Sequence, residues 1–250
     1  MMLTGKNAII YGAGGSIGGA VARAFAREGA KVHLTGRTRE PLDRLAAEIR
    51  EAGGAAETAL VDAMDPARVG EHARSVFEAD GRLDISMSVV GIDDVQGTPL
   101  TEMAWEDFSA PVVNALRSTF VTATAAARLM IGQGSGVILT FGGYGPPTAG
   151  LGGLQVAFQT QDSLRSVLAA ELGPHGIRVV TLQTGGITET LPADFEHAAA
   201  VTEAIDGATL LGRAATLADV GNVAAFAASD LASSITAAAL NITCGSVADH

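Results

Sequence analysis

Short apolar runs rich in Val, Ile and Leu recur along the chain, and longer alanine-rich segments with helical spacing separate them. Continuous apolar runs of this length are typical of strands that are buried on both faces. The predicted strands are residues 7–11, 31–35, 59–61, 85–90, 136–141, 178–183 and 239–243. The predicted helices are residues 17–28, 41–52, 66–80, 105–131, 154–172 and 217–229. This alternation predicts an α/β fold with a doubly wound parallel sheet of about seven strands.

The composition supports one large folded domain. Of 250 residues, 48% are hydrophobic and 17% are charged, so the chain can bury a large core. Because α/β domains commonly reach about this length, we expect a single domain over residues 1–250. The least patterned stretch is 188–209, which contains Pro192, Asp194 and Glu196 and predicts a mobile flap over a site.

The charge pattern argues against two classes of partner. Asp and Glu outnumber Lys and Arg by 27 to 16, giving a net charge of −11. Without a basic cluster, we expect neither nucleic acid nor a membrane surface as a partner. The longest weakly polar stretch, 119–131, is too short to span a bilayer, and the N-terminus lacks a signal pattern. The single cysteine, Cys244, allows no internal disulfide or metal cage, so we expect a cytoplasmic protein without a metal site.

A glycine-rich loop follows the first predicted strand and leads directly into a helix. Glycines permit a tight turn, and the free N–H groups of a helix N-terminus can accept a pyrophosphate. The candidate cofactor-binding residues here are Gly12, Gly14, Gly15, Ser16, Ile17 and Gly18. One alternative is a flexible turn without a ligand. Another is the nucleophile elbow of serine hydrolases, with His175 or His197 as a partner, but the loop's place on the first strand favours a nucleotide.

The end of the second predicted strand bears on the choice of cofactor. An acidic side chain here would bind the ribose hydroxyls of NAD. The residues are instead Gly36-Arg37-Thr38-Arg39, and two guanidinium groups can bind the 2′-phosphate of NADP. This local chemistry favours NADP over NAD, and the alternative interpretation is two solvated arginines.

Further segments, taken with the glycine loop, resemble the short-chain dehydrogenase/reductase family from about residue 4 to residue 246. They are the loop at 12–18, Asp62 after the third strand, Asn114 in the long central helix, and the segments 171–179, 211–213, 219–220 and 228–230 through to Gly245. The resemblance implies a single Rossmann-type domain that binds NAD(P) and transfers hydride to or from a carbonyl or alcohol.

The resemblance also assigns roles to individual residues. It places Asp62 near the adenine, Ile187 and Thr188 near the nicotinamide, and a substrate loop at 188–211. Relatives pair through helices that match 105–131 and 154–172, and both segments are rich in alanine here. We therefore expect a homo-oligomer, either a tetramer or a dimer.

The chain departs from the family pattern where the chemistry is expected. Counting back from Glu171, the family's Tyr-x-x-x-Lys pair falls on Leu154 and Phe158, and the family's serine falls near Gly142 and Gly143. Realignment cannot supply the lysine, because the chain has lysine only at positions 6 and 31. Carbonyl reduction needs a proton at oxygen, and a tyrosine delivers one near neutral pH only when a nearby cation lowers its pKa.

Two hypotheses remain open on the sequence. The first is a divergent NADP-dependent oxidoreductase whose acid comes from elsewhere, or whose substrate needs no strong acid at oxygen. Its candidate catalytic residues are Tyr144, which follows the fifth strand, and Asn114. Tyr144 could equally line a pocket, and Asn114 could equally bond backbone at a helix irregularity. The second hypothesis is a catalytically silent binding or scaffold protein. A lyase or isomerase has no positive motif, and the small-molecule substrate is not identified.

Overall fold

The computed structural model describes residues 1–191 and 197–248. They form one parallel sheet of seven strands, in the order β3-β2-β1-β4-β5-β6-β7, with helices on both faces. The strands are β1 Asn7–Tyr11, β2 Lys31–Gly36, β3 Ala55–Leu60, β4 Ile85–Ser88, β5 Gly136–Gly143, β6 Ile177–Thr184 and β7 Ala238–Asn241. The helices are α1 Ser16–Arg27, α2 Arg39–Glu51, α3 Pro66–Asp80, α4 Trp105–Gln133, α5 Leu154–Leu172, α6 Ala198–Gly207 and α7 Leu217–Ala228. The predicted doubly wound α/β fold is confirmed.

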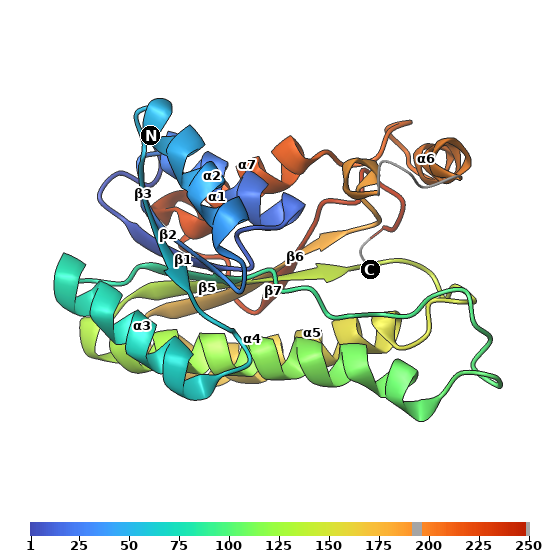
Figure 1. Ribbon diagram of the computed structural model, residues 1–250, viewed down its shortest axis with the longest axis horizontal. Coiled ribbons are helices and arrows are strands. Elements are labelled where there is room, and N and C mark those ends of the chain that lie inside the picture. The colour runs from blue at the N-terminus through green and yellow to red at the C-terminus, as the bar shows by residue number, and fades with distance from the viewer. Residues whose placement is uncertain (192–196, 249–250) are drawn as a thin grey trace.

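Two helical layers cover the sheet, with α1, α2 and α7 on one face and α3, α4 and α5 on the other (Figure 1). Successive side chains of β1 point to opposite faces of the sheet. Ala8 and Ile10 pack into the core under α1, α2 and α7, while Ile9 and Tyr11 pack into the core under α3, α4 and α5. Strands β2 and β3 lie on one side of β1, and strands β4 to β7 lie on its other side, so the strand order reverses between β1 and β4. Folds of this kind bind ligands at that point, outside the carboxyl ends of the strands.

The structure corrects some strand boundaries. The third strand covers Ala55–Leu60 rather than 59–61, because it is an edge strand with exposed Glu57 and a half-buried Thr58. Its residues lack the continuous apolar run that a central strand needs. The fourth strand ends at Ser88 rather than at residue 90, since its ladder with β1 stops at the pair Tyr11 and Ser88.

The described parts of the stretch 188–209 contain helical structure that was not predicted. They contain a single helical turn, Thr188–Thr190, and the helix α6. No residue of α6 is fully buried, but Val201 and Ile205 lie one turn apart and are both half-buried, a short apolar pattern that the prediction did not use. Pro192, Asp194 and Glu196 of the predicted flap lie outside the described residues.

Both lysines lie at the amino-terminal edge of the sheet. Lys6 directly precedes β1 and pairs with Asp230 at 3.0 Å, while Lys31 opens β2 and pairs with Asp80 at 2.7 Å. The opposite edge is therefore free of lysine. Among the described residues, none of the helices combines the length and apolar character needed to cross a membrane.

Candidate active site

The glycine loop after β1 is too closely packed for side chains at two positions. Gly12 has a φ of +84°, and a Cβ there would lie 2.5 Å from the carbonyl oxygen of Val89. A Cβ on Gly18 would collide with the carbonyl oxygen of Gly12. Glycine is required at both positions, because the loop folds directly onto the first turn of α1 and onto the segment after β4.

The start of α1 fits an anionic group. Gly15 is the N-cap and provides no side-chain cap, and the first turn contains no acidic residue. The amides of Ser16, Ile17 and Gly18 occupy the positions at which a helix has no internal acceptor. Gly14, Gly15 and Ser16 line a cavity of about 180 Å³ against α2. These residues can hold the pyrophosphate of a dinucleotide through backbone N–H groups and the positive end of the helix dipole.

Arg37 and Asp62 follow neighbouring strand ends beside this loop. The carbonyl oxygen of Thr35 accepts from the amides of Gly12 and Ala13, both at 3.0 Å, which fixes the end of β2 to the loop. Arg37 is exposed, and within residues 1–191 and 197–248 it makes no hydrogen bond or ion pair. The carboxylate of Asp62 accepts from the amide of Met64 at 2.9 Å, so it folds back into its own turn.

Ile187 and Thr188 follow the carboxyl end of β6, as predicted. The Ile187 side chain is buried in the core beneath α7, and its carbonyl oxygen accepts from the hydroxyl of Thr190 at 2.7 Å. Thr188 begins the single helical turn after this strand. The buried side chain of Ile187 leaves its backbone, rather than its side chain, to face a ligand.

Helix α5 begins with apolar residues at the two positions where the resemblance places the family's acid and cation. Leu154 is the first residue of α5 and Phe158 lies one turn later. A Cβ on Gly143 would lie 2.5 Å from the Cε2 atom of Phe158, and one on Gly142 would lie 3.7 Å from its Cδ1 atom. The ring thus packs directly against the last two residues of β5. A side chain at Gly143 and the ring of Phe158 would therefore compete for the same space.

Tyr144 follows β5 directly, and its amide donates to the carbonyl oxygen of Thr184 at 2.9 Å. The residue is half-buried. Within the described parts of the chain its hydroxyl has no hydrogen-bond partner, and no hydrogen bond joins it to Asn114. The two predicted catalytic residues are therefore not brought together by a direct bond.

Asn114 instead holds the loop after β4. Its Nδ2 atom lies 3.4 Å from the carbonyl oxygen of Ile92 and 3.5 Å from the Oδ2 atom of Asp93. Its own carbonyl oxygen accepts from the hydroxyl of Ser118 at 2.8 Å. Asp93 was not predicted from the sequence, because nothing in the local pattern shows that this loop turns back to α4.

Tyr11, the other tyrosine of the chain, is the last residue of β1, and its side chain is fully buried on the side of the sheet that α3 and α4 cover. Its hydroxyl has no partner among the described residues. Burial raises the pKa of Tyr11 far above its usual range, since the charged form would lose its hydration. Because its side chain is fully buried, the hydroxyl of Tyr11 is out of reach of a ligand.

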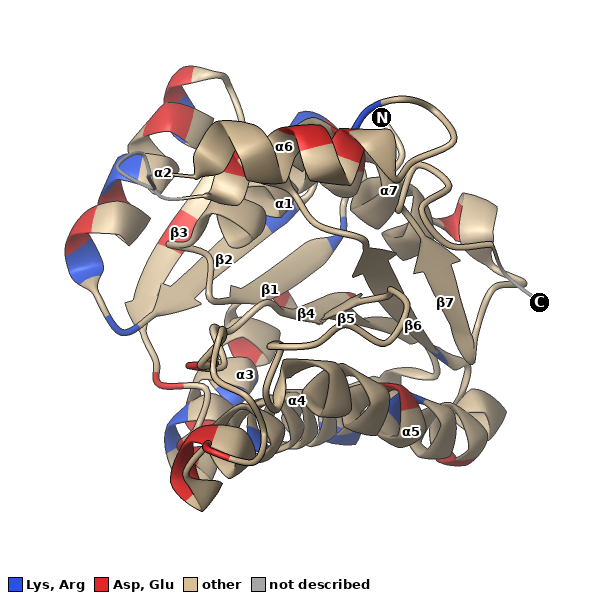
Figure 2. Cartoon of the chain, turned by 90° about the vertical axis from the view of Figure 1, so that its right-hand side faces the viewer, with Lys and Arg blue, Asp and Glu red and all other residues tan. Residues whose placement is uncertain are grey.

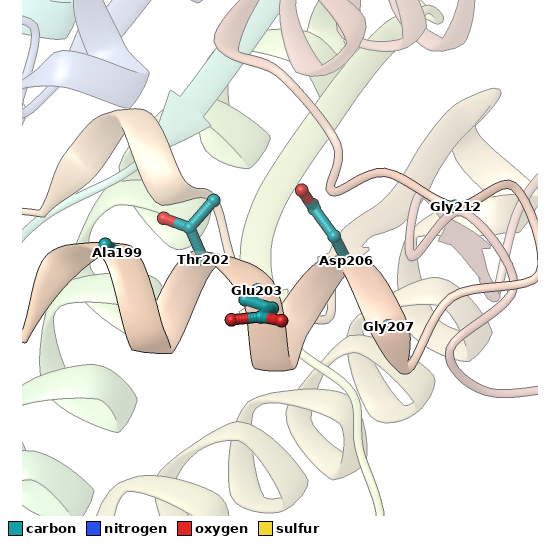
Figure 3. Close-up of a pocket in the computed structure, with 6 residues that line it drawn as sticks. All are labelled: Ala199, Thr202, Glu203, Asp206, Gly207 and Gly212. Carbon is teal, nitrogen blue, oxygen red and sulfur yellow. The ribbon is translucent and has the colours of Figure 1, made fainter.

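An open hollow of about 600 Å³ lies along α6, in the predicted substrate segment (Figure 3). It is lined by Ala199, Thr202, Glu203, Asp206, Gly207 and Gly212. The carboxylate of Asp206 already accepts from the amide of Ala214 at 2.6 Å, while Glu203 is exposed. None of the predicted cofactor-binding residues lines this hollow, so it is separate from the cavity at the glycine loop.

Comparison with known proteins agrees with the fold and the loop. Residues 12–246 match a family model described as enoyl-(acyl carrier protein) reductase. A 3alpha-hydroxysteroid dehydrogenase of Mediterraneibacter gnavus is 34% identical over 97% of each chain. A D-threitol dehydrogenase of Mycolicibacterium smegmatis is 29% identical over 97% of this chain and 93% of that protein.

Solved structures are also similar. A short-chain type dehydrogenase/reductase from Mycobacterium ulcerans has a TM-score of 0.91 and 25% identity, covering 98% of this chain and 91% of that chain. A dehydrogenase/reductase from Sinorhizobium meliloti has a TM-score of 0.86 and 30% identity, covering 98% of this chain and 96% of that chain. With the sheet order and the glycine loop, these similarities show that the chain belongs to the short-chain dehydrogenase/reductase family of NAD(P)-dependent oxidoreductases.

Proposed function

We propose that this protein is an NADP(H)-dependent oxidoreductase whose active site works without the family's Tyr-x-x-x-Lys pair. The proposal rests on two observations. The loop from Gly12 to Gly18, which we call the glycine cradle, packs closely before α1, and α5 begins with the apolar residues Leu154 and Phe158. Gly12 and Gly18 leave the first amides of α1 accessible to a pyrophosphate, while Leu154 and Phe158 stand where the acid and its cation would be. When bound, the cofactor supplies or accepts hydride.

The residues of this chain would divide the remaining work. The amides of Ser16, Ile17 and Gly18, with Gly14 and Gly15 beside them, would hold the pyrophosphate. Arg37 would bind the ribose 2′-phosphate, and Asp62 would lie near the adenine. The backbone at Ile187 and Thr188 would face the nicotinamide. These assignments follow the order of strand ends along the carboxyl edge of the sheet.

The apolar residues Leu154 and Phe158 limit which reactions the site can accelerate. Removal of general acid catalysis at oxygen costs roughly 10²- to 10⁴-fold in rate. Leu154 and Phe158 cannot donate a proton or lower the pKa of a donor. Tyr144 is the tyrosine that remains at this edge, since Tyr11 is buried, and its hydroxyl is our candidate donor for a residual carbonyl reduction.

A second candidate function is binding without turnover. The contact between Phe158 and Gly143 favours it, because the ring takes up space next to the end of β5 where a substrate carbonyl would need a polar partner. Detectable hydride transfer to any small-molecule acceptor would exclude this alternative.

The test is a reductase screen of the full chain with NADPH and common ketones and aldehydes, with the Tyr144→Phe variant beside the parent. We expect very weak turnover by the parent, and a further loss in the variant if Tyr144 donates the proton. Rapid turnover of common carbonyl substrates by the parent would contradict the proposed absence of the family's acid and cation. Unchanged residual activity in the variant would remove Tyr144 from the mechanism and leave it as a lining residue.

A further inference from the structure

Asp93 has an unusual backbone conformation at the carboxyl edge of the sheet. Its φ is +57°, in the left-handed region that residues other than glycine seldom adopt and that Asp and Asn tolerate best. The Nδ2 atom of Asn114 lies 3.5 Å from its Oδ2 atom and 3.4 Å from the carbonyl oxygen of the preceding Ile92. Helix α4 thus holds this turn, and the exposed carboxylate of Asp93 lies in the loop that follows β4.

The surrounding contacts place this carboxylate beside the site. The loop begins against β1, where the amide of Val89 donates to the carbonyl oxygen of Tyr11 at 2.9 Å. The carbonyl group of Val89 lies against Gly12. Farther along, the amide of Gly97 donates to the carbonyl oxygen of Gly150 at 2.7 Å. That second loop leads into α5 at Leu154. Asp93 therefore lies on the segment that runs from the glycine cradle to the apolar start of α5.

Charge is divided across this edge of the sheet. The described segments after β4, β5 and β6 are 89–104, 144–153, 185–191 and 197–212, and they contain no lysine or arginine. Their acidic residues are Asp93, Asp94, Glu102, Glu189, Glu203 and Asp206. The adjacent Arg213 is paired with Asp219 at 2.7 Å. Figure 2 shows the acidic residues on α6, and both basic and acidic residues along α2.

We propose that the substrate of this site is a cation with a C=N bond, an iminium ion, whose positive nitrogen is bound by the carboxylate of Asp93. The inference rests on the proposed function, because a bound dihydronicotinamide is the reductant. As the new C–H bond forms at the iminium carbon, the C=N π electrons become the lone pair of the product amine. No proton has to reach an oxygen.

This substrate class explains the apolar start of α5. A lysine at Phe158 would repel a cation, whereas Leu154 and Phe158 offer apolar surface to the hydrocarbon part of the substrate. The same reasoning disfavours a neutral ketone. Its oxygen becomes negative as hydride arrives, and Asp93 would oppose that charge while no nearby lysine offset it.

The experiment compares two ring systems of similar shape, with the full chain and NADPH. The cationic probe is N-methyl dihydroisoquinolinium, and the neutral probe is tetralone. We expect kcat/KM for the iminium to exceed that for the ketone by about a hundredfold or more. Asp93→Asn should lower it at least about tenfold, because it removes one charged partner and Asn tolerates the same backbone conformation. Glu78→Gln, an equal charge change at an exposed position of α3, should leave it unchanged.

A second readout does not depend on turnover. Calorimetry with the oxidised cofactor present should show that the protonated product, N-methyl tetrahydroisoquinoline, binds Asp93→Asn about tenfold more weakly than the parent, with NADPH affinity unchanged. If NADPH binds but neither the iminium nor the amine does, or if Asp93→Asn alters neither readout, this inference is wrong and the proposed function stands. If NADPH does not bind at all, both fail.

Discussion

The side chain of Phe158 and the missing side chain of Gly143 belong to one packing arrangement. The ring lies where a serine Cβ would have to be, 2.5 Å from the Cε2 atom. Gly143→Ser should therefore lower the free energy of unfolding by about 1–3 kcal/mol through overpacking. In the Phe158→Ala background the same change should cost much less, and urea denaturation of the four proteins measures that difference. Equal costs in both backgrounds would show that the ring moves aside freely.

Arg37 carries our prediction on cofactor choice. It is exposed and makes no ion pair within the described residues, so its guanidinium is available to a 2′-phosphate. Arg37→Ala should weaken NADPH binding about tenfold or more, since a charge-assisted hydrogen bond contributes roughly 1.5–3 kcal/mol. NADH binding should not change. Calorimetry with both cofactors is the measurement, and Arg74→Ala on α3 is the control. Equal affinity of the parent for both cofactors would contradict the prediction.

At the scale of elements, the sequence predicted best where local chemistry decides the structure. Helix α3 covers Pro66–Asp80 as predicted, because Asp65 caps its N-terminus by accepting from two amides and Gly81 ends it at a φ of +73°. Helix α6 was missed because its apolar pattern, Val201 and Ile205, spans only one turn. The glycine cradle was predictable from its place after β1. The contacts of Asn114 with Asp93 and of Phe158 with Gly143 were not, because they join segments that are distant in sequence.

Strand β2 and helix α3 are joined by a buried polar cluster with a pH dependence of its own. The Nε2 atom of His33 lies 2.9 Å from the Oδ2 atom of Asp80, and the ring of His33 meets that of His72 edge to face. Burial lowers the pKa of His72 to about 4, and the charge of His33 adds to the effect. Burial likewise lowers the pKa of His33, although Asp80 and Glu57 oppose this.

These shifts predict that acid destabilises the protein between about pH 6.5 and pH 4. With a lowered histidine pKa, the unfolded chain binds more protons than the folded chain in this window, so stability falls as pH falls. His72→Phe should flatten that pH dependence, measured by urea denaturation at several pH values. His175→Phe at an exposed position should not alter it. An unchanged slope in His72→Phe would show that His72 titrates normally.

At the scale of the whole molecule, one helical layer exposes an apolar surface. Helix α4 exposes Val113, Leu116 and Phe120 along one stripe, and α5 exposes Val156 and Val167. We propose that this layer, the lower one in Figure 1, pairs with a second copy of the chain. Phe120→Glu should shift the mass in light scattering toward the 25.3 kDa monomer, because a charge buried in an interface is costly. Phe226→Glu on α7 is the control, and a monomeric parent protein would contradict the prediction.

The position of the two lysines has a practical consequence for handling this protein. Lys6 and Lys31 both lie at the amino-terminal ends of strands, the first directly before β1 and the second at the start of β2. Coupling through the lysine side chains would therefore attach the molecule by that edge of the sheet. A sensor surface prepared in this way would hold the coupled protomer with its glycine cradle and Asp93 facing the flowing solution.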